Sequence, residues 1–158
     1  MKYGLPAALG DEVKLWMSFY GFRDQRLLSN ATAIGDLTVN RLGLGAMRVI
    51  DNDDIWGEPK DRANSLKVLR RAVELGVNFF DTAESYGPQT NETLIAEALY
   101  PYPKGFVVAT KCGLARPSPD RWDADCRPAK LRQDLEGSLK RLKLERIDLY
   151  QLHTVDPK

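Results

Sequence analysis

The chain has 158 residues, of which 43% are hydrophobic and 28% are charged, and its formal net charge is +1. This balance is typical of one ordinary soluble domain with a real hydrophobic core. So small a net charge gives no electrostatic reason to expect nucleic acid or an anionic membrane as a partner. The longest apolar runs are also too short to span a bilayer.

The N-terminus and the cysteines bear on where the protein works. The opening residues MKYGLPAALGDEVKLW include acidic residues where a signal peptide needs an unbroken apolar region. Cys112 and Cys126 match neither a disulfide framework nor a zinc-binding spacing. We therefore expect free thiols, no metal site and a cytoplasmic location.

Residues 1–32 do not share the regular pattern of the rest of the chain, and we expect an N-terminal extension there. It is either an accessory lid or poorly ordered sequence upstream of a single domain over residues 33–158. Residues 33–39 predict a small hairpin with its turn at Gly35-Asp36.

Short apolar runs and amphipathic stretches alternate from residue 42 onward. The apolar runs predict four strands, at 42–46, 77–81, 106–110 and 147–152. Because an amphipathic stretch lies between each strand and the next, the order is βαβαβαβ. This order predicts a parallel sheet with right-handed crossovers.

The three amphipathic stretches predict helices. The first covers about 61–76 and ends at Gly76, and the second is capped by Thr90 or Asn91 and ends before the prolines at 101 and 103. Pro128 suits the first turn of the third helix. The expected core stripe of that helix is Leu131, Leu135, Leu139 and Leu142.

Four ionisable side chains follow the ends of successive predicted strands. Asp81 ends the second strand, and Tyr86 lies in the loop after it. Lys111 ends the third strand, and His153, the only histidine, ends the fourth. Since the loops at the carboxyl ends of parallel strands face a common mouth, we expect these side chains to meet there.

Together these four residues suit the reduction of a carbonyl group, although each alone has an ordinary structural explanation. A carbonyl oxygen needs a proton when hydride attacks the carbon, and a phenol with a pKa near ~10 gives one reluctantly. A neighbouring ammonium favours the phenolate, and a carboxylate keeps that ammonium charged and in place. We expect Tyr86 to be the proton donor, Lys111 and Asp81 to tune it, and His153 to orient the carbonyl.

Four segments carry a resemblance to a known family: RLGLGAMR at 41–48, GVNFFDTAESYGPQTNETLIAEAL at 76–99, VVATKCG at 107–113 and SLKRLKLERIDLYQLH at 138–153. Through them the chain resembles the aldo-keto reductases, which are (β/α)8 TIM barrels that use NADPH. The catalytic tetrad of that family falls on Asp81, Tyr86, Lys111 and His153. The stretches IWGEPKDR and EALYPYP are similar to the pyridoxal reductase subgroup.

The resemblance implies an α/β fold, the N-terminal half of a (β/α)8 TIM barrel. It would have four parallel strands with three intervening helices, after the short hairpin and the N-terminal extension. A whole barrel needs eight strands, typically in ~250 residues. The resemblance also implies that Gly45, Ala46 and Met47 contact the cofactor near the nicotinamide, close to Asp81. Most of the NADPH site would belong to the strands that this chain lacks.

The expected function is therefore NADPH-dependent reduction of a small-molecule aldehyde or ketone to an alcohol. Two alternatives are a truncated, catalytically inactive half-barrel and a non-enzymatic binding module. The open edges of a half-barrel also predict self-association, with the fourth strand of each copy pairing with the first strand of the other. Trp56, in the first loop, would line an aromatic-tolerant pocket or anchor that loop by packing.

Overall fold

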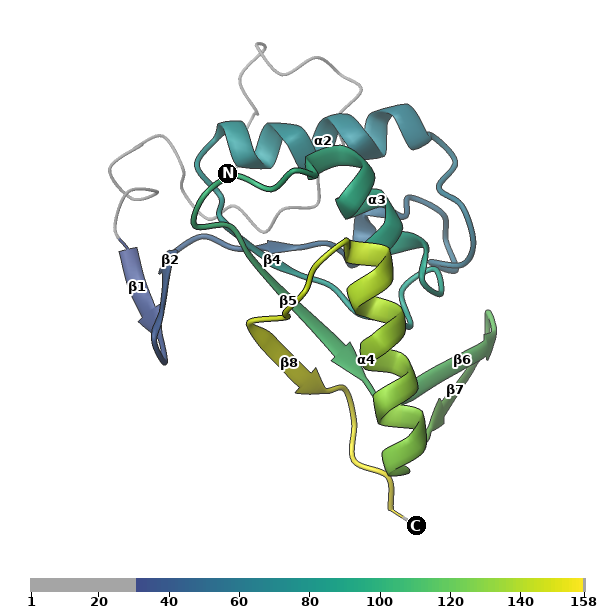
Figure 1. Ribbon diagram of the computed structural model, residues 1–158. Coiled ribbons are helices and arrows are strands. Elements are labelled where there is room, and N and C mark those ends of the chain that lie inside the picture. The colour runs from purple at the N-terminus through teal and green to yellow at the C-terminus, as the bar shows by residue number, and fades with distance from the viewer. Residues whose placement is uncertain (1–30, 158) are drawn as a thin grey trace, which may run out of the picture.

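The computed structural model describes residues 31–157 of the protein (Figure 1). The predicted N-terminal extension thus lies almost wholly outside the described residues. The described part opens with an antiparallel hairpin of β1 (Ala31–Ile34) and β2 (Leu37–Asn40). Gly35 takes a φ of 61° in the turn, a conformation that glycine adopts without steric cost. The hairpin and its turn are as predicted.

The centre of the fold is a four-stranded parallel sheet. Its strands lie side by side in chain order: β3 (Leu44–Gly45), β4 (Phe79–Asp81), β5 (Val107–Cys112) and β8 (Leu149–Leu152). Residues 107–110 are all buried, as expected for a strand covered on both faces. The strands are parallel, lie in chain order and are joined by helices. This is the topology predicted for half of a TIM barrel.

Helix α2 (Arg62–Glu74) follows β3 and the short 3₁₀ helix η1 (Met47–Val49). The carboxylate of Asp61 caps it by accepting a hydrogen bond from the backbone N–H of Asn64 at 2.8 Å. Leu69 and Ala72 face the core, and Gly76 turns the chain away with a φ of 91°. The periodicity and the glycine stop seen in the sequence are both confirmed.

Helix α3 (Thr90–Leu99) is present, but its predicted cap is wrong. The N-cap is Gln89, with a φ of 67° and no side-chain capping bond. The side chain of Asn91 instead points at the sheet, where Nδ2 donates to the carbonyl of Ala46 at 2.7 Å. Its Oδ1 accepts from the Thr82 hydroxyl at 2.7 Å. Asn91 therefore ties the loop after β3 to the loop after β4.

Helix α4 (Pro128–Leu142) has its proline in the first turn, as predicted, and the expected leucine stripe is confirmed in part. Of the four leucines in that stripe, Leu142 alone is fully buried. The buried line of the helix is Asp134, Ser138 and Leu142. Asp134 turns inward because its carboxylate accepts a hydrogen bond from the Gly113 N–H at 3.2 Å.

A second hairpin, β6 (Leu114–Ser118) with β7 (Arg121–Ala124), was not predicted. LARPS contains a charge and a proline and does not alternate, and RWDA alternates over only four residues, too few to distinguish a strand from a loop. Figure 1 shows this hairpin projecting from the carboxyl end of β5, beside α4. The core lies between the sheet and the helices, and its largest fully buried apolar side chains are Phe80, Ile50, Leu69, Leu94, Ile95 and Leu142. No helix within residues 31–157 has the length and apolar character to cross a membrane.

Candidate active site

A lysine–aspartate ion pair lies at the carboxyl edge of the sheet. Asp81 is the last residue of β4, and Lys111 extends from the neighbouring strand β5. The ammonium of Lys111 donates to Asp81 Oδ2 and to the carbonyl of Thr82, both at 2.8 Å. The side chain of Lys111 is 14% exposed and that of Asp81 is 37% exposed. The pair is therefore shielded on the lysine side and open on the aspartate side.

Tyr86 brings its phenol to this ion pair from the loop after β4. Its hydroxyl lies 3.5 Å from Lys111 Nζ, and the ammonium is 5.1 Å from the centre of its ring. Backbone hydrogen bonds hold the loop on the neighbouring strand, from Thr82 to Ala109 at 2.8 Å and from Glu84 to Lys111 at 3.3 Å. The phenol is 8% exposed.

His153 completes the group from the residue after β8. Its N–H donates to the carbonyl of Cys112 at 2.9 Å, and its ring stands edge-on to Tyr86 with the centroids 5.7 Å apart. Burial lowers the pKa of His153, the Lys111 ammonium lowers this pKa further, and Asp81 partly opposes them. The imidazole is therefore neutral near pH 7. The structure thus brings all four predicted residues together.

Ser85 is a member of this cluster that sequence reasoning missed. Its hydroxyl lies 3.3 Å from Nδ1 of His153, and the residue is 1% exposed. The sequence feature that could have indicated it is its position directly before Tyr86 in TAESYG, in the same loop after β4. A buried hydroxyl on Nδ1 can hold the imidazole in one tautomer.

The predicted cofactor-contacting residues lie beside the ion pair. The N–H of Ala46 donates to the carbonyl of Asp81 at 2.8 Å, which places residues 45–47 next to the site. Gly45 is exposed, and the space that its missing side chain would occupy holds no atom within 4 Å. Ala46 is fully buried and Met47 is half-buried. Gly45 and Asp81 therefore lie on the same accessible surface. Ala46 could contact a cofactor only through its backbone, because its side chain is buried.

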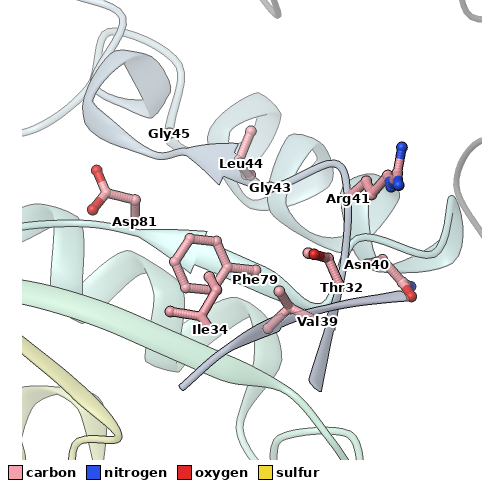
Figure 2. Close-up of a pocket in the computed structure, with 10 residues that line it drawn as sticks. All are labelled: Thr32, Ile34, Val39, Asn40, Arg41, Gly43, Leu44, Gly45, Phe79 and Asp81. Carbon is pink, nitrogen blue, oxygen red and sulfur yellow. The ribbon is translucent and has the colours of Figure 1, made fainter. Parts of the chain in front are cut away.

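A pocket of about 330 Å³ lies between the β1–β2 hairpin and strands β3 and β4 (Figure 2). Figure 2 shows Asp81 at one end of this pocket and Arg41 at the other. Its walls are mainly apolar and include Ile34, Val39, Leu44 and Phe79. Of the four clustered site residues, Asp81 alone lines it. The pocket thus belongs to the inner face of the half-barrel, whereas the chemistry gathers at the mouth.

One further carboxyl and two thiols lie outside the cluster. Burial raises the pKa of the Glu84 carboxyl, and a hydrogen bond from Gln89 at 3.2 Å partly offsets this rise. Cys112 and Cys126 are free thiols, and burial raises the pKa of Cys112. Within residues 31–157 no group of three or more His, Cys, Asp and Glu side chains could hold a metal ion.

Comparison with known proteins decides the family, because residues 41–158 match the Aldo/keto reductase family. The chain belongs to this family. It is 52% identical to an uncharacterized oxidoreductase of Schizosaccharomyces pombe over 125 residues, which cover 79% of this chain and 40% of that protein. It is 38% identical to the pyridoxine 4-dehydrogenase of Escherichia coli over 127 residues, or 80% of this chain and 44% of that enzyme.

Solved structures of the aldo/keto reductase family have the same fold over this region. The glycerol dehydrogenase of Gluconobacter oxydans matches with a TM-score of 0.69 and 34% identity, covering 80% of this chain and 40% of that one. An aldo-keto reductase of Bacillus halodurans in its holo form matches with a TM-score of 0.67 and 30% identity, covering 78% and 39%. The chain spans less than half the length of these relatives. The predicted family and the predicted half-barrel are both confirmed.

Proposed function

We propose that the chain carries the proton-transfer half of an NADPH-dependent reductase that converts an aldehyde or ketone into an alcohol. One observation carries the proposal: the Lys111 ammonium lies 2.8 Å from the Asp81 carboxylate and 3.5 Å from the Tyr86 hydroxyl. A phenol next to a fixed ammonium is equipped to release a proton, since the positive charge stabilises the phenolate that remains. The family membership supports this chemistry.

The residues present fit the nicotinamide end of the cofactor. Nothing lies within 4 Å of the position that a side chain at Gly45 would take, so a flat ring can approach the ion pair from that side. We propose that Gly45, Ala46 and Met47 form this side of the cofactor site, with Asp81 at its edge. When bound, NADPH supplies the hydride that attacks the carbonyl carbon.

Tyr86 then gives its hydroxyl proton to the carbonyl oxygen, and the C=O bond becomes a C–O–H group. Lys111 stabilises the negative charge on the phenol oxygen. Asp81 holds the lysine in place, and the Thr82 carbonyl accepts a second hydrogen bond from the same ammonium at 2.8 Å. Because the ammonium is largely buried, water screens this stabilisation less than it would at the surface.

His153 is proposed to orient the carbonyl as a neutral donor. We propose that the Ser85 hydroxyl, 3.3 Å from Nδ1, donates to this nitrogen, which leaves the ring proton on Nε2. An Nε2–H group beside the Tyr86 ring can then donate to the carbonyl oxygen that receives the proton. Ser85 thus assists by fixing the tautomer, a role that the sequence pattern alone does not suggest.

The first aldehyde to test is pyridoxal. The E. coli relative is a pyridoxine 4-dehydrogenase, and dehydrogenation of a primary alcohol is the reverse of aldehyde reduction. The similarity to a glycerol dehydrogenase makes glyceraldehyde the second choice. Both are small carbonyl compounds that carry hydroxyl groups.

An NADPH titration of the 158-residue chain, followed by its tryptophan fluorescence, tests the proposal. Saturable quenching at micromolar NADPH with turnover of an aldehyde would support the proposal, because it would mean that the half-barrel, alone or paired, forms a usable site. Tyr86→Phe should keep the quenching and lose turnover by about 10²-fold or more, the usual contribution of a positioned acid. No quenching up to millimolar NADPH would contradict the proposal for this polypeptide. The alternative of an inactive half-barrel would then hold, in keeping with the chain's span of 40% and 44% of its relatives.

A further inference from the structure

Arg116, on β6, is a buried cation that the proposed chemistry does not use. It is 6% exposed, and its guanidinium reaches across to the loop that follows η1. Nη1 donates to the carbonyl of Ile55, and Nη2 donates to the carbonyls of Asp54 and, at 2.8 Å, Pro119. Arg116 thus binds the backbone of a loop about sixty residues earlier in the chain and the turn of its own hairpin.

Two tryptophan rings enclose the same guanidinium. Its central carbon lies 4.1 Å from the ring centre of Trp122, on β7, and 5.4 Å from that of Trp56. Contacts between a cation and an indole face strengthen when water is excluded. The guanidinium is largely buried here, whereas Trp122 is 43% exposed. These contacts fit the predicted role of Trp56 as the packing anchor of its loop. Arg116, Trp56 and Trp122 together form what we call the arginine clamp.

The clamped loop is in turn bonded to the loop that carries Tyr86. The N–H of Gly57 donates to the carbonyl of Gly87 at 2.9 Å, and Trp56 forms a parallel bridge with Gly87. Gly87 directly follows Tyr86, has a φ of 86°, and is packed so closely that a Cβ there would lie 2.3 Å from Ile50 Cδ1. The hydrogen bond between Gly57 and Gly87 therefore couples the position of residues 54–57 to that of Tyr86.

We propose that Arg116 is a positioning residue. Through the clamped loop, it keeps Tyr86 in its place beside Lys111 and His153. A stabilising role alone explains it poorly, because a buried charge is costly and an apolar side chain often replaces one without loss. Its Nε is also buried with no hydrogen-bond partner within residues 31–157. The planar guanidinium instead fixes the relative position of two segments, because it donates hydrogen bonds to three carbonyls in them at once.

The single histidine of the chain gives a direct test of this inference. Its Hε1 proton is one NMR resonance, and the Tyr86 ring lies edge-on to the imidazole, so the chemical shift reports the position of Tyr86. Arg116→Met should shift or broaden this resonance, although the arginine does not act on His153 directly. It should also speed amide exchange at Gly57 by about tenfold or more, because hydrogen bonds from a charged donor are lost.

Arg121→Met is the matched control, because Arg121 lies on the same hairpin and bonds to Asp123 two residues away. It should leave the His153 resonance and the Gly57 exchange rate unchanged. Arg116→Lys keeps the charge and reaches fewer carbonyls, and it should fall between the wild type and Arg116→Met. If Arg116→Met does not fold, Arg116→Lys decides by the same two measurements.

A folded Arg116 variant with an unchanged His153 resonance and unchanged Gly57 exchange overturns the clamp. The catalytic meaning of the clamp rests on the proposed function, whereas neither of these two measurements needs turnover. If both measurements change as expected but the chain has no reductase activity, the proposed function is contradicted and the clamp is not. In an active chain, Arg116→Met should lower kcat and leave KM for NADPH nearly unchanged.

Discussion

His153 reports the electrostatics of the site at the scale of one residue. Partial burial of its ring and the charge of the Lys111 ammonium both lower the pKa of His153. We predict an NMR titration of its Hε1 proton with a midpoint below the ordinary value of about 6.5. Lys111→Met should raise that midpoint, since it removes the cation and leaves Asp81 facing the ring. A midpoint at or above the ordinary value in the unaltered chain would contradict the neutral donor role.

The lowered pKa of His153 also predicts how the free energy of unfolding changes with pH. The unfolded chain takes up a proton on His153 as the pH falls through about 6.5, while the folded chain resists it. The contribution of His153 is therefore complete above that pH and lost below it. Glu84 acts in the opposite direction, because its raised pKa means that the folded state binds the proton more tightly than the unfolded state does.

At the scale of one element, α3 is joined to its neighbours by a buried carboxylate. Glu92 is fully buried, accepts from the Thr110 hydroxyl at 2.6 Å and pairs with Arg141 Nε at 2.7 Å. One side chain thus links α3 to β5 and α4. The strand that it reaches, β5, also carries Lys111.

We predict that Glu92→Ala lowers the free energy of unfolding by about 3–5 kcal/mol, because Arg141 loses its partner in a buried setting. Glu97→Ala is the matched control on the same helix. Glu97 pairs with Arg62, but both side chains are about two-fifths exposed, so the loss should stay below about 1 kcal/mol. Urea unfolding followed by circular dichroism measures both values, and equal losses would contradict the assignment.

The elements also show where sequence reasoning succeeds and fails. Four strands and three helices follow from local periodicity, and the four clustered site residues follow from one rule about parallel strand ends. The α4 stripe is confirmed only in part, because Asp134 is drawn inward by a bond to Gly113, which local hydrophobicity cannot reveal. Ser85 and Arg116 fail for a related reason, since their partners lie 68 and 61 residues away in the sequence.

At the scale of the whole molecule, the sheet has two open edges. Within residues 31–157, β8 pairs with β5 on one side, β3 pairs with β4 on one side, and no strand lies beyond either. Leu152, on β8, is a 50% exposed apolar side chain. Unpaired edges of this kind recruit other strands. We propose that two copies pair β8 with β3 twice and close an eight-stranded barrel.

Light scattering tests this proposal, with an expected mass of twice the 17.8 kDa of one chain. Leu152→Lys puts a charge on the open edge and should return the chain to a monomer. Tyr100→Lys is the control, because Tyr100 is a 52% exposed apolar residue at the end of α3, remote from both edge strands in the sequence. A folded, monomeric wild-type chain would overturn the idea.

The bonds that shape the tetrad come from within this half of the barrel. Lys111 is held by Asp81 and the Thr82 carbonyl, and Asn91 locks the adjoining loops. The four clustered side chains and the groups that fix them therefore lie in one continuous segment, residues 81–153. We propose that this segment can be exchanged between family members as one unit without disturbing the geometry around Tyr86.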